Sequence, residues 1–151
     1  MLPTLTLRAE SETQSLQASL LRQLGTGHLN EAKNTLKSLI ADVPYSNKKL
    51  ASMDMEERYR LIISSILNAI GFRVEVERML ATGRIDIVAY SYGYIYVMEL
   101  KLSNNGGMLA AKEQILNNKY LAPFKADKRK VIGLAIELDE KGKGLIDWEE
   151  V

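Results

Sequence analysis

Two neighbouring segments of this chain are apolar on both of their faces. Residues 84–90 and 94–102 are rich in aromatic and β-branched side chains, and the Tyr92-Gly93 pair between them is typical of a turn. A strand with one solvated face alternates apolar and polar residues, whereas a strand covered on both faces reads as a nearly continuous apolar run. We therefore expect a hairpin of central strands in a sheet on which helices pack.

The segments around this hairpin alternate between helical and extended patterns. Residues 54–70 show a helical period, and residues 72–77 then alternate apolar and polar side chains, as a half-buried strand does. After the hairpin, residues 108–120 predict a helix, and residues 131–136 and 144–148 predict further strands. The resulting α-β-β-β-α-β order indicates an α/β fold with a mixed central sheet of four or five strands.

The first part of the chain has a different pattern. Residues 11–41 carry leucines at helical spacing on either side of Gly25-Thr26-Gly27, which predicts two helices joined by a short turn. His28 beside that turn is interpreted as a cap or surface residue. We expect a helical extension over residues 1–50 and an α/β domain over residues 51–151.

Composition excludes several kinds of site. The absence of cysteine rules out disulfides and thiolate-bound metals, and a single histidine rules out a two-histidine metal centre. Lys and Arg number 20 against 19 Asp and Glu, for a net charge of +1, so nucleic-acid binding would depend on local basic patches. No signal peptide and no membrane-spanning apolar run are recognisable, so we expect a cytoplasmic location.

Two acidic residues and a lysine interrupt the apolar hairpin. If the turn is symmetric, Asp86 lies directly opposite Glu99, with Cβ atoms roughly 4.5–5.5 Å apart. Lys101 points to the same side of the sheet as Glu99. Opposed like charges in a buried sheet are destabilising, so they need compensating cations: Lys101 is one, and a divalent ion held by carboxylate oxygens is the other. A structural ion pair of the same three residues is the alternative.

These residue types match the chemistry of phosphodiester hydrolysis. Bound Mg²⁺ or Mn²⁺ polarises a phosphoryl oxygen and lowers the pKa of a coordinated water. A lysine beside that water orients or deprotonates it, and its charge offsets that of the pentacovalent transition state. The three residues therefore indicate a phosphodiesterase site.

The order of motifs resembles a known superfamily. Gly83-Arg84-Ile85-Asp86, followed by Glu99-Leu100-Lys101, is similar to the PD-(D/E)xK nucleases, in the branch found at the C-terminus of bacterial AAA-ATPase-like proteins of uncharacterised function. Ile85 stands where other branches have proline. The resemblance extends from about residue 54 to the C-terminus and includes these further positions: Glu56, Tyr59, Gly71, Glu77, Gln114, Lys119 and Tyr120.

The resemblance implies a restriction-endonuclease-like fold and a role for each motif residue. It implies a set of metal ligands for Mg²⁺ or Mn²⁺: Asp86, Glu99 and the main-chain carbonyl of Leu100. It implies a set of catalytic residues: Asp86, Glu99, Lys101 as the catalytic lysine, Glu56 as an auxiliary acid, and Gln114 facing the site from the helix after the third strand.

A basic connector follows that helix. Its lysines and arginine, beginning at Lys125, are candidates to bind a phosphate backbone next to the site, and a solvated loop is the alternative. With the motif residues of the helix, the candidate nucleic-acid contacts are Lys119, Tyr120, Lys128, Arg129 and Lys130. The expected partner is nucleic acid, DNA in preference to RNA.

Three functions from different classes stay open. The first is a metal-dependent nuclease. The second is a catalytically silent nuclease-fold domain that recognises or regulates a partner, such as an ATPase module. The third is a homo-oligomerisation module built on the N-terminal helices. No GxxxxGK[ST] loop is present, so an ATPase module would belong to a longer parent chain.

Overall fold

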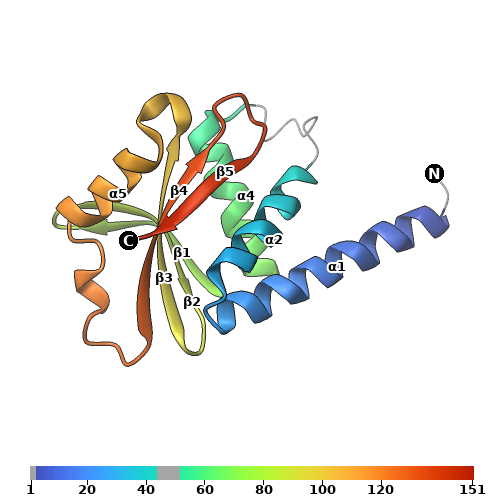
Figure 1. Ribbon diagram of the computed structural model, residues 1–151, viewed down its shortest axis with the longest axis horizontal. Coiled ribbons are helices and arrows are strands. Elements are labelled where there is room, and N and C mark those ends of the chain that lie inside the picture. The colour runs from blue at the N-terminus through green and yellow to red at the C-terminus, as the bar shows by residue number, and fades with distance from the viewer. Residues whose placement is uncertain (1–2, 44–51) are drawn as a thin grey trace.

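The computed structural model describes residues 3–43 and 52–151, and its centre is a mixed five-stranded sheet (Figure 1). The strands lie in the order in which they occur along the chain: β1 (Arg73–Leu80), β2 (Gly83–Tyr90), β3 (Tyr94–Leu102), β4 (Lys130–Leu138) and β5 (Leu145–Glu150). β3 and β4 are parallel, and the other neighbouring pairs are antiparallel. The mixed sheet and the predicted α-β-β-β-α-β order are confirmed.

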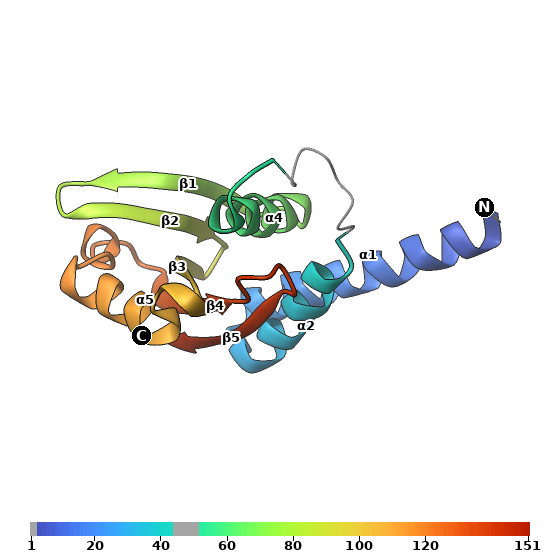
Figure 2. The same cartoon turned by 90° about the horizontal axis from the view of Figure 1, so that it is seen from above.

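Helices cover both faces of the sheet. On one face lie α1 (Pro3–Gly25), α2 (Leu29–Ala41) and α4 (Met55–Ala69), and on the other lies α5 (Gly107–Asn117) (Figures 1 and 2). Two buried clusters follow from this arrangement, one between the sheet and the first three helices and one between the sheet and α5. β2 and β3 contribute to both clusters, as expected for central strands that are apolar on both faces.

Helix α4 carries local signals at both of its ends. The Asp54 side chain accepts a hydrogen bond from the Glu57 N–H at 2.9 Å, which caps the first turn. Gly71 follows the helix with a φ of 103°, a left-handed conformation that glycine adopts at little cost. Between these ends, Tyr59 and Ile63 are buried against the sheet, as their helical spacing predicts.

The N-terminal helices pack on the same core. Leu20 and Leu36 belong to the buried cluster that also contains Tyr59 and Leu134. The hydroxyl of Tyr96 in β3 donates a hydrogen bond to the Leu24 carbonyl near the end of α1. The α1–α2 hairpin is therefore attached to the sheet, although the first turns of α1 extend away from it (Figure 1).

The proposed domain boundary at residue 50 lies outside the described residues, so the division of the chain into two domains stays a prediction. In the part of the chain that the structure covers, no helix combines the length and the apolar character that are needed to cross a membrane.

Candidate active site

Strands β2 and β3 separate at Asp86. Their ladder runs from Tyr90 opposite Ile95 to Ile87 opposite Met98, which is the register predicted from a symmetric turn. Beyond that pair, Asp86 Oδ2 accepts a hydrogen bond from the Leu100 main-chain N–H at 2.9 Å. A side chain thus takes the place of a main-chain partner, and the two central strands open where the polar residues begin.

A cleft of about 640 Å³ lies at this opening. Its walls come from α4, the end of β1, the β1–β2 turn, the start of β2, the end of β3, and α5 with the residues that follow it. The lining residues are Glu56, Met79, Leu80, Ala81, Thr82, Gly83, Arg84, Asp86, Glu99, Lys101, Gln114, Asn118 and Tyr120. All five side chains expected to form a catalytic site line this one cleft. The fold therefore brings them together from elements that span residues 56–114.

Two acidic side chains of the cleft are largely removed from water. Asp86 is 5% exposed and Glu99 is 1% exposed. Burial raises the pKa of Glu99 well above its ordinary value, and the adjacent Asp86 raises it further through a hydrogen bond and through its charge. Burial also raises the pKa of Glu56, with the charge of Asp86 as the next cause. The charge of Lys101 acts in the opposite direction on both glutamates.

One carboxylate oxygen in the cleft has no hydrogen-bond donor. Glu99 Oε1 is buried, and no described residue donates a hydrogen bond to it. A buried carboxylate oxygen without a donor is costly unless a proton or a cation neutralises the group. Among the described residues, no three acidic, histidine or cysteine side chains form a cluster that could hold a metal ion. Asp86 and Glu99 nevertheless offer carboxylate oxygens, the ligand type that hard divalent ions take, so with the main-chain carbonyl of Leu100 they are the residues that could hold such an ion.

An arginine that the sequence analysis missed lies beside this pair. Nη1 of Arg60 in α4 is 3.6 Å from Asp86 Oδ1, and its Nη2 is 2.7 Å from Glu77 Oε1. Arg84 Nη1 lies 3.6 Å from the same Glu77 oxygen. Arg60 follows Glu56 by four residues, so the two lie on one face of the helix. That spacing is the signal from which Arg60 could have been found.

The backbone of β1 is irregular beside Asp86. Val76 pairs with Ile87 and Arg78 pairs with Ile85, but Glu77 between them is not paired with Asp86. Glu77 has a φ of 52°, which is uncommon for a residue other than glycine. This local bend accompanies the contact between Glu77 and α4.

The α5 side of the cleft is organised by the hydroxyl of Tyr120. That oxygen accepts hydrogen bonds from Gln114 Nε2 at 3.1 Å, from Asn118 Nδ2 at 3.3 Å and from the Arg84 N–H at 3.2 Å. Thr82 Oγ1 donates to the Asn118 carbonyl at 2.6 Å and fixes the β1–β2 turn to the same wall. The contacts of Thr82 and Asn118 were not predicted, because they join segments 36 residues apart.

The two expected nucleic-acid contacts that follow α5 lie in different surroundings. Tyr120 lines the cleft, but its side chain is fully buried and its hydroxyl is engaged by Gln114 and by the Arg84 N–H. Lys119 does not line the cleft but a separate pocket of about 340 Å³, together with Leu116 and Lys125.

The basic connector also lies away from the cleft. Lys130 pairs with Tyr94 at the start of β3, whereas Lys101 is near its end, roughly 23 Å away at the usual rise per residue of a strand. Arg129 donates to both Asp127 carboxylate oxygens at 2.9 Å, and its guanidinium carbon lies 5.2 Å from the centre of the Tyr90 ring. The expectation that Lys128, Arg129 and Lys130 lie next to the site is therefore wrong. The parallel crossover through α5 returns the chain to the beginning of β3.

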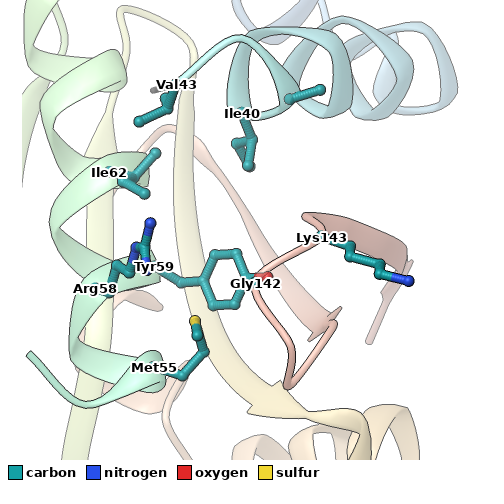
Figure 3. A pocket seen from close by; sticks show the side chains of 9 residues that line it. Ile40, Val43, Met55, Arg58, Tyr59, Ile62, Gly142 and Lys143 are labelled. Carbon is teal, nitrogen blue, oxygen red and sulfur yellow. The ribbon is translucent and has the colours of Figure 1, made fainter. Parts of the chain in front are cut away.

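Another cavity borders α4 away from the cleft, and the contacts of Tyr59 beside it hold the fold together. It measures about 280 Å³ and is bordered by α2, α4 and the loop between β4 and β5 (Figure 3). The Tyr59 hydroxyl donates to the Asp139 carbonyl at 2.7 Å and accepts from the Gly144 N–H at 3.0 Å. Figure 3 shows the ring directed toward the loop at Gly142. Tyr59 thus ties α4 to this loop and not to the cleft.

Comparison with known families matches the part of the chain that contains the cleft. The family described as the PD-(D/E)XK nuclease superfamily matches residues 54–148. The match begins at the residue that caps α4 and ends within β5, so it contains every residue of the cleft and leaves α1 and α2 outside. Neither the curated proteins nor the solved structures provide a match to the chain.

Proposed function

Since the chain belongs to the PD-(D/E)XK nuclease superfamily, we propose that it is a metal-dependent nuclease that hydrolyses phosphodiester bonds of DNA in the cleft between β2 and β3. The observation that carries this proposal is the buried pair of Asp86 and Glu99, with one unpartnered carboxylate oxygen, in the cleft that Lys101 lines. In the metal-free protein the raised pKa of Glu99 favours a protonated carboxyl, and a divalent ion would take the place of that proton.

The residues that would hold Mg²⁺ or Mn²⁺ are Asp86, Glu99 and the main-chain carbonyl of Leu100. When bound, such an ion polarises a phosphoryl oxygen and lowers the pKa of a coordinated water. The Asp86 side chain is oriented for this role by the Leu100 N–H, which engages Oδ2 and leaves Oδ1 directed toward α4.

Lys101 is assigned to water positioning and charge stabilisation, and Glu56 is assigned to proton transfer. The Lys101 ammonium positions the attacking water and offsets negative charge on the phosphoryl group. The raised pKa of Glu56 keeps its carboxyl protonated to a higher pH than usual, so it is suited to act as an auxiliary acid. Gln114, held by the Tyr120 hydroxyl, lines the opposite wall and is assigned to positioning of the substrate.

The nuclease proposal is tested by cleavage assays with Mg²⁺ or Mn²⁺ on plasmid and single-stranded DNA. Asp86→Ala and Lys101→Ala are each expected to lower the cleavage rate on the order of a hundredfold. Lys112→Ala removes a lysine outside the cleft, which contacts Glu149 at 3.2 Å, and serves as the matched control with unchanged cleavage. Equal cleavage by all four proteins would assign the activity to a contaminant.

A second candidate function is a catalytically silent nuclease-fold domain that docks on a partner, such as an ATPase module of a longer parent chain. The net charge of +1 favours it because nucleic-acid enzymes often carry a stronger basic bias. The arginine beside Asp86 favours it because a guanidinium at that position opposes the binding of a metal ion. Calorimetric titration with Mn²⁺ separates the two candidates. Binding that disappears in Glu99→Ala supports the nuclease, and absence of binding supports the docking domain.

A further inference from the structure

We propose that Arg60 is a built-in counter-ion that sets the affinity of the cleft for a divalent cation, and that Glu77 holds Arg60 partly away from Asp86. This inference rests on the proposed metal-dependent nuclease. It adds two positioning residues to the site: neither is a metal ligand, and both act through Asp86.

The first observation is which oxygen of Asp86 the guanidinium faces. Oδ2 is engaged by the Leu100 N–H at 2.9 Å, so Oδ1 is the more available of the two oxygens for a cation. Arg60 Nη1 lies 3.6 Å from Oδ1, which is an ion pair but longer than a good hydrogen bond. The Arg60 guanidinium is therefore close enough to Asp86 Oδ1 to compete with a metal ion for that oxygen. The contact is also long enough for a metal ion to replace it.

The second observation is that the same guanidinium is held more tightly elsewhere. Arg60 Nη2 is 2.7 Å from Glu77 Oε1, nearly an ångström shorter than its contact with Asp86. The planar guanidinium has several donors in a fixed arrangement, so it contacts both acids at once. The Arg60 side chain is only 14% exposed, which confines it to the space between them.

The third observation is the backbone of Glu77. Its left-handed φ occurs at the one position of β1 that faces Asp86, where the ladder is interrupted. Such a conformation costs free energy in a residue with a side chain, and costs of this kind gather at functional sites. Here it accompanies the contact that places the Glu77 carboxylate against Arg60.

These contacts have an electrostatic consequence. Repulsion between two cations is strong where water is largely excluded, so a guanidinium beside Asp86 lowers the affinity for a divalent ion. Glu77 reduces that repulsion because it draws the guanidinium toward β1. When no metal is bound, the Arg60 guanidinium thus compensates part of the charge of Asp86. When a metal is bound, the guanidinium keeps its ion pair with Glu77.

The test is calorimetric titration of the full chain with Mn²⁺, with the Mn²⁺-dependent shift in melting temperature as a second readout. Arg60→Met is expected to tighten Mn²⁺ binding by about three- to tenfold. Glu77→Gln is expected to weaken it by a similar factor, because Arg60 then turns to Asp86. In the double variant most of the effect of Glu77→Gln disappears, because no guanidinium remains to be redirected.

Arg84→Met is the matched control. It removes the same charge from the same Glu77 oxygen, at 3.6 Å, but from a side chain that is half exposed. It is expected to change Mn²⁺ affinity less than Arg60→Met does. Equal tightening by both variants would reduce the effect to net charge and overturn the proposal, as would unchanged or weaker binding by Arg60→Met. If that variant does not fold, Arg60→Gln carries the same expectation.

The outcomes also separate this inference from the nuclease proposal. If the wild type binds Mn²⁺ in a way that depends on Glu99 but not on Arg60, only the counter-ion proposal is overturned. Absence of binding in the wild type and in every Arg60 variant overturns both. Binding gained only after removal of Arg60 supports the counter-ion directly.

Discussion

The Asp86 carboxylate and the Leu100 amide are joined by a buried hydrogen bond of 2.9 Å at the point where two central strands separate. Asp86 therefore has two tasks, to satisfy a main-chain donor and to present charge in the cleft. A substitution that keeps the hydrogen bond but removes the charge measures the two contributions separately.

Asp86→Asn keeps an oxygen acceptor for the Leu100 N–H but removes the charge. We expect it to fold with nearly wild-type stability and to lose Mn²⁺ binding and DNA cleavage. Asp86→Ala leaves the buried N–H without a partner and is expected to lower the free energy of unfolding by about 1–3 kcal/mol as well. Urea denaturation and calorimetry measure the two effects. Equal stability of the two variants would show that the hydrogen bond contributes little.

Glu99→Gln is expected to remove a pH dependence of stability. The pKa of Glu99 is raised in the folded protein from an ordinary value of 4.5, so the native state binds more protons than the unfolded state does above that pH. Stability of the metal-free wild type should therefore fall as pH rises from about 4.5 toward the raised pKa. Glu99→Gln has no such proton and should be more stable than the wild type at pH 8, by on the order of 1 kcal/mol.

Melting temperatures of both proteins across this pH range, in the presence of a chelator, measure the difference. Glu56→Gln is expected to act in the same direction, since burial also raises the pKa of Glu56. Glu113→Gln, at an exposed position of α5, is the control. Parallel pH profiles for wild type and Glu99→Gln would contradict the expectation.

The relative positions of Asp86, Glu99 and Lys101 were predictable because they depend on one hairpin. A two-residue turn fixes the register of its strands, so the numbers of Asp86 and Glu99 alone place them together. Lys101 follows from the alternation of side chains along one strand. The contacts of Arg60 with Asp86 and Glu77 were harder to predict, because Arg60 comes from a helix and Glu77 from an irregular strand.

The position of the basic connector shows where the local patterns were insufficient. A helix between two strands favours a parallel crossover, which returns the chain to the start of the previous strand. With that rule, Lys130 belongs beside Tyr94 and far from Lys101, as the register of β3 and β4 shows. Nearness in sequence to the helix that borders the site does not show which end of the strand the connector reaches.

Glu137 is expected to stabilise the start of α5. Its Oε1 accepts a hydrogen bond from the Met108 N–H at 2.9 Å, and its Oε2 accepts from Ser103 Oγ at 2.6 Å. Because Glu137 pairs with Lys101 in the sheet, these bonds fix α5 beside the strand that carries the lysine. Glu137→Ala should lower the free energy of unfolding by about 1–2 kcal/mol.

Glu137→Gln retains an acceptor for the Met108 N–H and should cost less than Glu137→Ala in the same urea denaturation experiment. Glu113→Ala, at an exposed position of α5, controls for removal of a carboxylate near this region. A loss no larger for Glu137→Ala than for Glu137→Gln would assign the effect to charge and not to the two hydrogen bonds.

Because the basic connector lies far from the cleft, we expect the affinity for nucleic acid to depend on the length of the substrate. Roughly 23 Å corresponds to about 7 nucleotides at the phosphate spacing of one DNA strand, so the connector contacts only substrates that extend that far beyond the cleft. Lys128→Glu with Lys130→Glu should weaken binding of duplexes of about 30 base pairs by about tenfold and leave oligonucleotides of about 6 nucleotides unaffected. Arg129 is kept, because Asp127 and Tyr90 already hold it. Fluorescence anisotropy at fixed salt measures both substrates, and equal weakening of both would mean that the connector acts through the overall charge of the protein.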